Sequence, residues 1–404
     1  MSRDVSHQTV PAAAPRPATG LIFYAIVLGT FLAASSAPTP LYRVYQHTWD
    51  FSPIMLTVIF SVYAFSLLLS LLFVGSLSDH VGRRPVIFAS LLGQALALLL
   101  FFLAENTTML IAARVVQGLA TGAASGAVGA ALVDMNRTRG PIVNSIAPLL
   151  GMAMGALGSS ALVQFAPAPM HLVYAVLLVV VLLQALLIWR IPETVGAQPG
   201  ALASLRPQIN VPARAKSALM AITPLNISVW ALGGFYLSLV PSVVSVSTGN
   251  SAPLVGGLVV ATLTVSGAIA VFVLREKHPG LPLAIGPLAM ILGVLTVLAG
   301  IHCGLTAPLL VGTAIAGIGF GSSFLGSVRT IMPLAAADER AGLLSAFYIQ
   351  SYLAFSVPAI AGGLLSHEIG LAPATDVYAG FILLLSLGGL VTIRRTGLNR
   401  TAPL

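Results

Sequence analysis

The chain has 404 residues, of which 57% are hydrophobic and only 7% are charged. Soluble domains have about 25% charged residues, so this composition excludes a soluble globular protein and places most of the surface against lipid or other helices. The formal net charge of +8 does not indicate nucleic-acid binding, because the basic residues form no patch interleaved with aromatic residues. The single cysteine, Cys303, excludes an internal disulfide.

Twelve apolar runs follow a polar tail (1–18) whose composition predicts disorder. The first run begins near Gly20 without a small-x-small cleavage site, so no signal peptide is expected. Each run approaches the length of about 20 residues that a helix needs to cross a bilayer. The runs are 21–41, 53–74, 86–104, 109–133, 142–165, 171–189, 218–244, 254–274, 281–303, 305–328, 342–366 and 377–393. They predict an all-α membrane protein with twelve transmembrane helices in two six-helix bundles.

The expected division of the chain is a bundle at 19–190, a linker at 191–217, a bundle at 218–394 and a tail at 395–404. If both termini lie on one side, 17 of the 19 Lys and Arg residues fall on that side. The positive-inside rule then predicts that the termini and the linker are cytoplasmic. The Lys-poor composition favours a bacterial inner (cytoplasmic) membrane.

The loop between the second and third runs, GSLSDHVGRRP at 75–85, carries the most informative motif. Its charges cannot lie in hydrocarbon, and its glycines permit a close helix approach and a positive φ where the chain reverses. Asp79 can accept hydrogen bonds from an Arg or from helix amides. The pattern closely resembles the loop 2–3 signature of the major facilitator superfamily of secondary transporters. The match covers Gly75, Leu77, Asp79, Gly82, Arg83 and Arg84.

Arg114 is the one charge inside a predicted span, and with Gln117 and Gly118 it resembles the fourth-helix pattern of that family. The resemblance implies a role in proton coupling and in organising the substrate site. An Arg in the bilayer costs about 2.5 kcal/mol or more, so we expect it to face a cavity and contact a polar group of another helix. The alternative is a side chain that extends to the external membrane surface near Asn106.

Asp134 ends the fourth run on the side that also carries the loop at 75–85. By resemblance, these residues form a cytoplasmic gate that holds the halves together when the protein opens outward; the alternative is a turn that only fixes topology. The proposed gate consists of Gly75, Asp79, Gly82, Arg83, Arg84 and Asp134.

Two further stretches resemble the family. Gly151, Gly155 and Gly158 partly match the glycine-rich fifth helix of its drug-efflux antiporters, although the central Gly-Pro pair is missing and helix packing explains them about as well. Residues 191–194 (IPET) match a segment often found after the sixth helix. A GxxxG pair at Gly118 recurs at Gly317, which supports two related halves with a site at the midplane, although such pairs also occur wherever helices pack closely.

Polar and aromatic side chains near the middle of the spans are candidates for contact with substrate or coupling ion, although each could instead bridge helices. Besides Ser35 and Ser36, they are Arg114, Gln117, Asn144, Asn226, Trp230, Tyr236, Tyr348, Gln350 and Tyr352. No Walker loop, Cys/His cluster or Gly-x-Ser-x-Gly motif with plausible partners is present, so we expect no enzyme, no cofactor and no metal.

We therefore expect a monomeric transporter in the lipid bilayer that exports small, largely apolar molecules by alternating access, with protons as the coupling ion. No Asp or Glu lies at mid-span, which leaves three possibilities open: an edge carboxylate, indirect coupling through Arg114, or no coupling at all. The alternatives to export are uptake or facilitated diffusion of a neutral metabolite, and a non-transporting membrane sensor.

Overall fold

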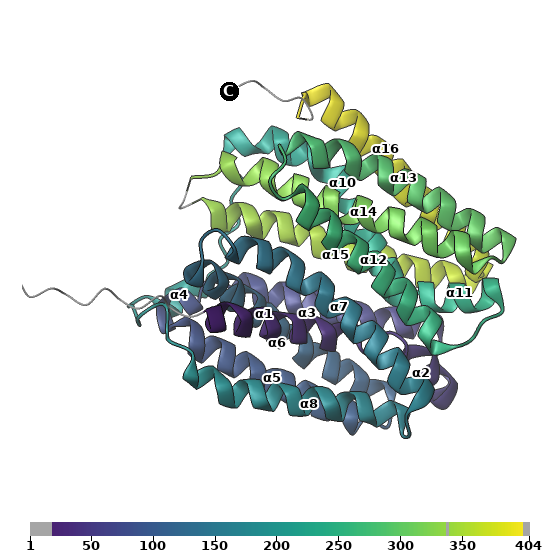
Figure 1. Ribbon diagram of the computed structural model, residues 1–404, viewed down its shortest axis with the longest axis horizontal. Coiled ribbons are helices and arrows are strands. Elements are labelled where there is room, and N and C mark those ends of the chain that lie inside the picture. The colour runs from purple at the N-terminus through teal and green to yellow at the C-terminus, as the bar shows by residue number, and fades with distance from the viewer. Residues whose placement is uncertain (1–17, 337–338, 399–404) are drawn as a thin grey trace, which may run out of the picture.

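A computed structural model describes residues 18–336 and 339–398 (Figure 1). Within these residues every regular element is a helix, and twelve helices are long and apolar enough to cross a membrane. The first six are α1 (Ala18–Ser36), α3 (Pro53–Val74), α5 (Arg83–Phe102), α6 (Thr107–Met135), α7 (Gly140–Phe165) and α8 (Pro169–Leu187). The second six are α10 (Ala213–Ser238), α12 (Pro253–Leu274), α13 (Gly280–Cys303), α14 (Thr306–Ile331), α15 (Arg340–Ile369) and α16 (Leu371–Thr396). The predicted fold class is therefore confirmed.

Local sequence explains several helix ends. Ser52 precedes α3, and its side chain accepts a hydrogen bond from the N–H of Met55 (3.3 Å). Asn106 caps α6 in the same way through the N–H of Met109 (3.0 Å). After α13, Gly304 has a φ of 67°, a left-handed conformation that glycine adopts without steric cost. This turn separates α13 from α14 although few polar residues lie between them.

Six short helical segments connect the spans. They are α2 (Tyr42–Trp49), α4 (Ser78–Val81), η1 (Ile188–Arg190), α9 (Ala201–Ser204), α11 (Val240–Thr248) and η2 (Met332–Leu334). The runs at 21–41 and 218–244 were expected as single spans, but α1 ends at Ser36 and α10 ends at Ser238. The physical reason is proline, which cannot donate a backbone hydrogen bond inside a helix: Pro38 and Pro40 follow α1, and Pro241 lies in the first turn of α11.

Several helices also extend beyond the expected runs, and α10 and α16 are examples. The helix α10 begins at Ala213 rather than 218, and α16 continues to Thr396 rather than 393. Both extensions carry basic residues, such as Arg214 and Arg394. A spanning helix can continue into the polar zone outside the hydrocarbon, so an apolar run underestimates its length.

Each half encloses its own apolar core. In Figure 1 the first half (purple to teal) lies beside the second (green to yellow), and α3 and α7 face α15 and α12 across the boundary. We call this boundary the seam. A further cluster of buried residues, which includes Phe60, Ala156, Val260 and Phe355, joins the two halves along it.

The repeated GxxxG pairs serve the same packing role in both halves. A Cβ atom at Gly118 would overlap the carbonyl oxygen of Tyr63 on α3, and one at Gly317 would overlap that of Leu263 on α12. The helix pairs α6–α3 and α14–α12 thus approach each other closely, as small residues permit in membrane bundles. For these glycines the packing interpretation accounts for the contacts.

The two ends of the seam differ. At the end opposite the linker the halves meet tightly: Thr39 Oγ1 donates to the Leu237 carbonyl (3.2 Å), and Ser61 Oγ donates to the Ser356 carbonyl (3.3 Å). Towards the linker end every residue from 142 to 148 of α7 is partly exposed, on all faces of the helix. The seam is therefore closed at one end and loosely packed at the other.

Candidate functional site

Arg114 lies inside the first bundle with only 1% of its surface exposed. Its Nε donates to the Tyr42 hydroxyl (3.1 Å), and one terminal nitrogen donates to the Ser35 carbonyl (3.0 Å) and to Gln117 Oε1 (2.6 Å). The Gln117 amide in turn donates to the Ala34 carbonyl (3.0 Å). Arg114 therefore contacts polar groups of α1 and α2 and does not extend to the membrane surface. That it faces a substrate cavity stays a prediction.

Aromatic rings complete the surroundings of Arg114. Its guanidinium carbon lies 5.6 Å from the ring centroid of Tyr42, 5.2 Å from that of Tyr63 and 5.7 Å from that of Phe101, within cation–π range. Its hydrogen-bond acceptors in the described part of the chain are all neutral. The charge is thus held by dipoles and rings rather than by a carboxylate.

Aromatic side chains from both halves gather at the seam. We call them the seam cluster: Phe60, Tyr63, Trp230, Tyr348, Tyr352 and Phe355. The rings of Phe60 and Phe355 lie 4.9 Å apart across the seam. On the second half, Trp230 lies 4.9 Å from Tyr352 and 5.9 Å from Phe355, and Tyr348 lies 6.2 Å from Tyr352. The structure therefore brings together three sequence candidates, Trp230, Tyr348 and Tyr352.

Exposure increases along this cluster towards the linker end. Phe355 is buried, whereas Tyr352 and Tyr348 are partly exposed. On α3 the same change occurs between Leu67, which is buried, and Leu71, which is partly exposed. The cluster thus lies where the closed part of the seam meets its loosely packed part.

Asn226 and Gln350 form a polar network one helical turn from Trp230. The Asn226 amide donates to Gln350 Oε1 (3.0 Å) and to Ser351 Oγ (3.0 Å). The Gln350 amide donates to Thr223 Oγ1 (2.9 Å). These bonds tie α10 to α15 within the second half, so the network supports the wall that carries Trp230.

Three candidates lie elsewhere, and one of them, Ser36, donates through Oγ to the Met152 carbonyl of α7 (2.9 Å). Tyr236 is buried in the core of the second half, where its hydroxyl is bonded to Thr313 Oγ1 (2.9 Å). Asn144 lies on the partly exposed end of α7, with its amide beside Gly129 of α6. The structure groups neither Tyr236 nor Asn144 with the seam cluster.

The charged residues near the linker form a network inside the first half. Arg83 pairs with Asp79 (2.5 Å) and, through Nε, with Asp134 (3.1 Å), and it is only 7% exposed. Gly82 has a φ of 97°, and Gly75 lies close to Gly126 of α6. The two glycines thus supply the positive φ and the close approach that the loop sequence predicts.

Glu193 completes this network from the segment after α8. Its carboxylate accepts the backbone N–H groups of Arg83 (2.9 Å) and Arg84 (2.9 Å), the first two residues of α5. A carboxylate at a helix N-terminus is favoured by the helix dipole and by the unpaired N–H groups there. A side chain at position 82 would meet this carboxylate, so Gly82 makes room for it. The guanidinium of Arg84 lies 5.0 Å from the ring centroid of Trp189.

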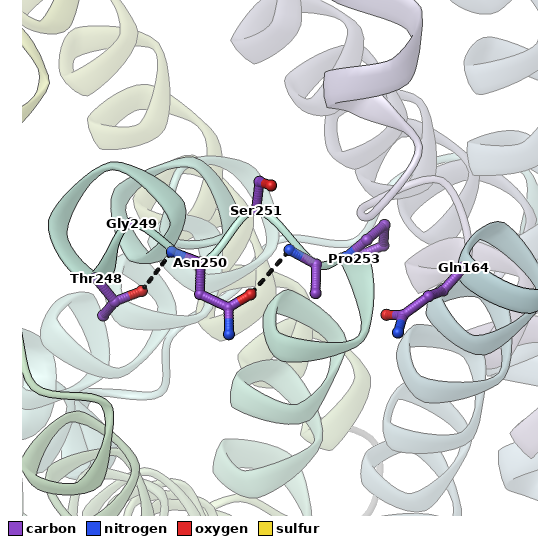
Figure 2. Close-up of a pocket in the computed structure, with 7 residues that line it drawn as sticks. Gln164, Thr248, Gly249, Asn250, Ser251 and Pro253 are labelled. Carbon is purple, nitrogen blue, oxygen red and sulfur yellow. Dashed lines mark hydrogen bonds between the residues drawn. The ribbon is translucent and has the colours of Figure 1, made fainter.

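A separate cavity of about 620 Å³ opens between the end of α7 and the loop before α12 (Figure 2). Gln164 lies on one side, and its Oε1 accepts the N–H of Leu254 (3.1 Å), so it caps α12 across the seam. Opposite, the Thr248 hydroxyl accepts from Asn250 N–H (3.3 Å) and the Asn250 side chain accepts from Ala252 N–H (3.0 Å). The side chains of Gln164, Thr248 and Asn250 are thus engaged in turn and cap bonds.

Sequence reasoning missed several contributors to these sites. Tyr42 lies just beyond the predicted run at 21–41 and was not singled out, although it and Tyr45 are both buried on the short helix α2. Phe60 and Phe355 were not singled out, because an aromatic residue in an apolar run carries no signal of which face it occupies. Glu193 was noted only as part of a family segment, and its capping role depends on contact with a helix more than 100 residues earlier in the chain.

Comparison with known proteins agrees with this architecture. A sequence model of the family described as "Major Facilitator Superfamily" matches residues 21–296. "Major facilitator-type transporter psiT2" from Psilocybe cyanescens is 44% identical over 63 residues, which cover 16% of this chain and 12% of that protein.

Two crystal structures of a bacterial homolog of the human lysosomal transporter Spinster, both inward-facing, are similar in fold. The occupied form has a TM-score of 0.75 at 12% identity, and the unoccupied form has 0.73 at 14%. In each case the similarity covers 97% of this chain and 100% of the other.

Proposed function

Because the chain belongs to the major facilitator superfamily of transporters, we propose that it exports small, largely apolar molecules across a bacterial cytoplasmic membrane by proton-coupled alternating access, as drug-efflux members do. The observation that carries this proposal is the seam cluster. It lies between the two halves, consists of aromatic side chains and contains no ionised group. Such a surface suits a small apolar ligand held by few polar contacts.

The difference between the two ends of the seam supports alternating access. With both termini and the linker on the cytoplasmic side, the closed end is external and the loosely packed end faces the cytoplasm. The proposed gate residues Asp79, Arg83 and Asp134 then lie at the cytoplasmic end, and in this structure they pair with one another inside the first half. A latch to the second half is proposed for the state in which this end closes.

The groups available for proton coupling lie near the linker end of the first half. Among the described residues the buried charged side chains are Arg83, at the start of α5, and Arg114. Carboxylates lie nearer the linker end, at Asp79, Asp134 and Glu193, and these are the groups that could exchange protons with the cytoplasm. The absence of a buried Asp or Glu from the described spans favours a second candidate, facilitated diffusion of a neutral metabolite.

Transport in inverted membrane vesicles separates these functions. Compounds that stabilise the purified protein against heat are first selected, and their uptake into inverted vesicles is then measured with and without a protonophore. Proton-coupled export predicts accumulation above equilibrium that the protonophore abolishes. Equilibration alone supports facilitated diffusion, and the absence of any flux above empty vesicles supports a non-transporting protein.

A further inference from the structure

We infer that the seam cluster binds an uncharged planar aromatic molecule that carries a hydrogen-bond acceptor, and that it rejects organic cations. The inference rests on the proposed transport function, because it names the substrate class of the same site. Three independent observations carry it: the geometry of the rings and, among residues 18–336 and 339–398, an indole N–H without a partner and a buried positive charge without a counterion.

The seam cluster contains rings from both halves, and neighbouring rings lie within contact distance of one another. Trp230 lies near three rings, at 4.9 Å from Tyr352, 5.9 Å from Phe355 and 6.4 Å from Phe324, with interplanar angles between 57° and 78°. Aromatic pairs favour such edge-to-face and tilted arrangements. A planar ring placed between the halves would meet several rings at once, whereas a saturated ligand would lose these specific contacts.

The indole of Trp230 supplies the polar requirement. Its Nε1 is buried, and no hydrogen-bond partner for it exists among the described residues. An indole nitrogen is a donor only, and a buried donor without a partner is unfavourable. Asn226, one helical turn earlier, makes no bond to the indole: its amide N–H groups donate to Gln350 and Ser351, and its Oδ1 accepts from Ser351 Oγ (3.4 Å). A ligand carbonyl or ether oxygen would satisfy this N–H, while a ligand with donors only would not.

Arg114 determines the sign of charge that the site tolerates. Its guanidinium stacks on Tyr63, a member of the seam cluster, at 5.2 Å, and its acceptors are the neutral groups of Tyr42, Ser35 and Gln117. No Asp or Glu is buried among the described residues. The uncompensated positive charge therefore opposes a cation at the seam, where a carboxylate would be needed to hold one.

The chain offers a site-specific reporter, because it has three tryptophans. Trp49 stacks on Tyr45 in α2, and Trp189 lies beside Arg84 near the linker end. In a variant with Trp49→Phe and Trp189→Phe, indole emission arises from Trp230 alone.

Protein in lipid nanodiscs would be titrated with three probes. Methyl 2-naphthoate is uncharged and has a carbonyl, 2-methylnaphthalene lacks an acceptor, and the third probe is the 2-naphthylmethyl-trimethylammonium cation. Free tryptophan with empty nanodiscs corrects for probe that partitions into lipid.

We expect methyl 2-naphthoate to quench Trp230 emission saturably. 2-Methylnaphthalene should bind about tenfold more weakly, because it leaves the indole N–H unpaired. The cation should give no saturable change in emission. The inference is overturned if the ester gives no saturable quenching, or if the cation binds as tightly as the ester. Flux is not part of this readout. Binding with the expected selectivity but without transport would therefore contradict the proposed function and leave the ligand class standing.

Variants assign each preference to its residue in direct binding of tritiated methyl 2-naphthoate. Trp230→Phe keeps a ring but removes the donor, so it should remove the difference between the ester and 2-methylnaphthalene. The matched control Trp49→Phe should leave that difference unchanged. Arg114→Gln should raise the affinity for the cation relative to the ester; an unchanged ratio would show that Arg114 does not set the charge preference. If Arg114→Gln does not fold, the ratio of the cation affinity to the ester affinity in the parent protein still shows whether the site rejects cations.

Discussion

At the scale of single residues, the structure assigns two buried arginines to different chemical surroundings. Arg83 is paired with two carboxylates at the start of α5, so its charge is neutralised near the membrane surface. Arg114 has only neutral acceptors and aromatic faces.

Replacement of Arg114 by Ala should abolish accumulation against a gradient while the protein still inserts into the membrane. The change removes hydrogen bonds to a charged group, which contribute about 1.5–3 kcal/mol each, and leaves Tyr42 and Gln117 without their partner. Flux and thermal stability would be measured together, with Arg43→Ala, at a partly exposed position of α2, as the matched control. Unchanged flux in Arg114→Ala would remove this residue from the mechanism.

For the proposed gate, we expect Asp79→Asn to favour the state that is open to the cytoplasm and to slow turnover. Asn keeps the size of the side chain but removes the charge that the proposed latch to the second half would use when the cytoplasmic end closes. The pair with Arg83 lies within the first half, and its half-exposed carboxylate makes it a weak contact. A cysteine at Ser145, on the partly exposed end of α7, would report the change as faster labelling in a Cys303→Ser background. Asp50→Asn, in the opposite loop, serves as the control. If labelling and turnover equal those of the parent protein, the loop at 75–85 only sets the membrane topology.

At the scale of elements, glycines decide how closely helices approach within and between the halves. The pairs α6–α3 and α14–α12 use the same glycine spacing, which explains the internal repeat as a packing device. Across the seam, Gly257 of α12 lies against Ser160 and the Ala156 carbonyl of α7. This contact belongs to the closed end, where any opening of the seam must separate the two helices.

Gly257→Val should therefore hold the closed end apart. Overpacking costs about 1–3 kcal/mol, which changes the ratio of two access states by about five- to 150-fold. Labelling of a cysteine at Ser61 by a membrane-impermeant maleimide should increase, and transport should fall. Gly158→Val on α7 is the matched control, because a Cβ atom there meets nothing within 4 Å. If Gly257→Val labels no faster than the control, the contact does not limit opening.

At the scale of the whole molecule, the two halves are separate packing units joined by the seam and by the linker. Their cores are distinct, and the polar contacts between them at the closed end consist of single hydrogen bonds such as those of Thr39, Ser61 and Gln164. Each such bond contributes about 0.5–1.5 kcal/mol net. Rigid halves with a modest seal between them fit a protein that rocks between two states of similar free energy.

A cross-link across the seal should stop transport, whereas one within a half should not. Gln164 and Leu254 are hydrogen-bonded neighbours on α7 and α12, and cysteines there, in a Cys303→Ser background, can be joined by a short reducible cross-linker. The matched control joins positions 302 and 376 within the second half, where His302 Nε2 lies 2.9 Å from Asp376 Oδ1. Transport should fall only with the first pair and return on reduction. Full activity of that cross-linked pair would rule out movement of α7 against α12.

The sequence by itself determined the membrane fold, the twelve spans, the two halves and the family, because hydropathy, charge placement and the loop at 75–85 are local properties of the chain. It also identified Arg114, since a charge inside a span is visible without a structure. The tertiary structure alone decided where helices stop at prolines, which acceptors surround Arg114, and that Trp230, Tyr348 and Tyr352 meet Phe60 and Phe355. An apolar helix in a bilayer is hydrophobic on every side, so its sequence does not reveal which face packs against a partner. That choice depends on shape and close contact between segments as far apart as α3 and α15.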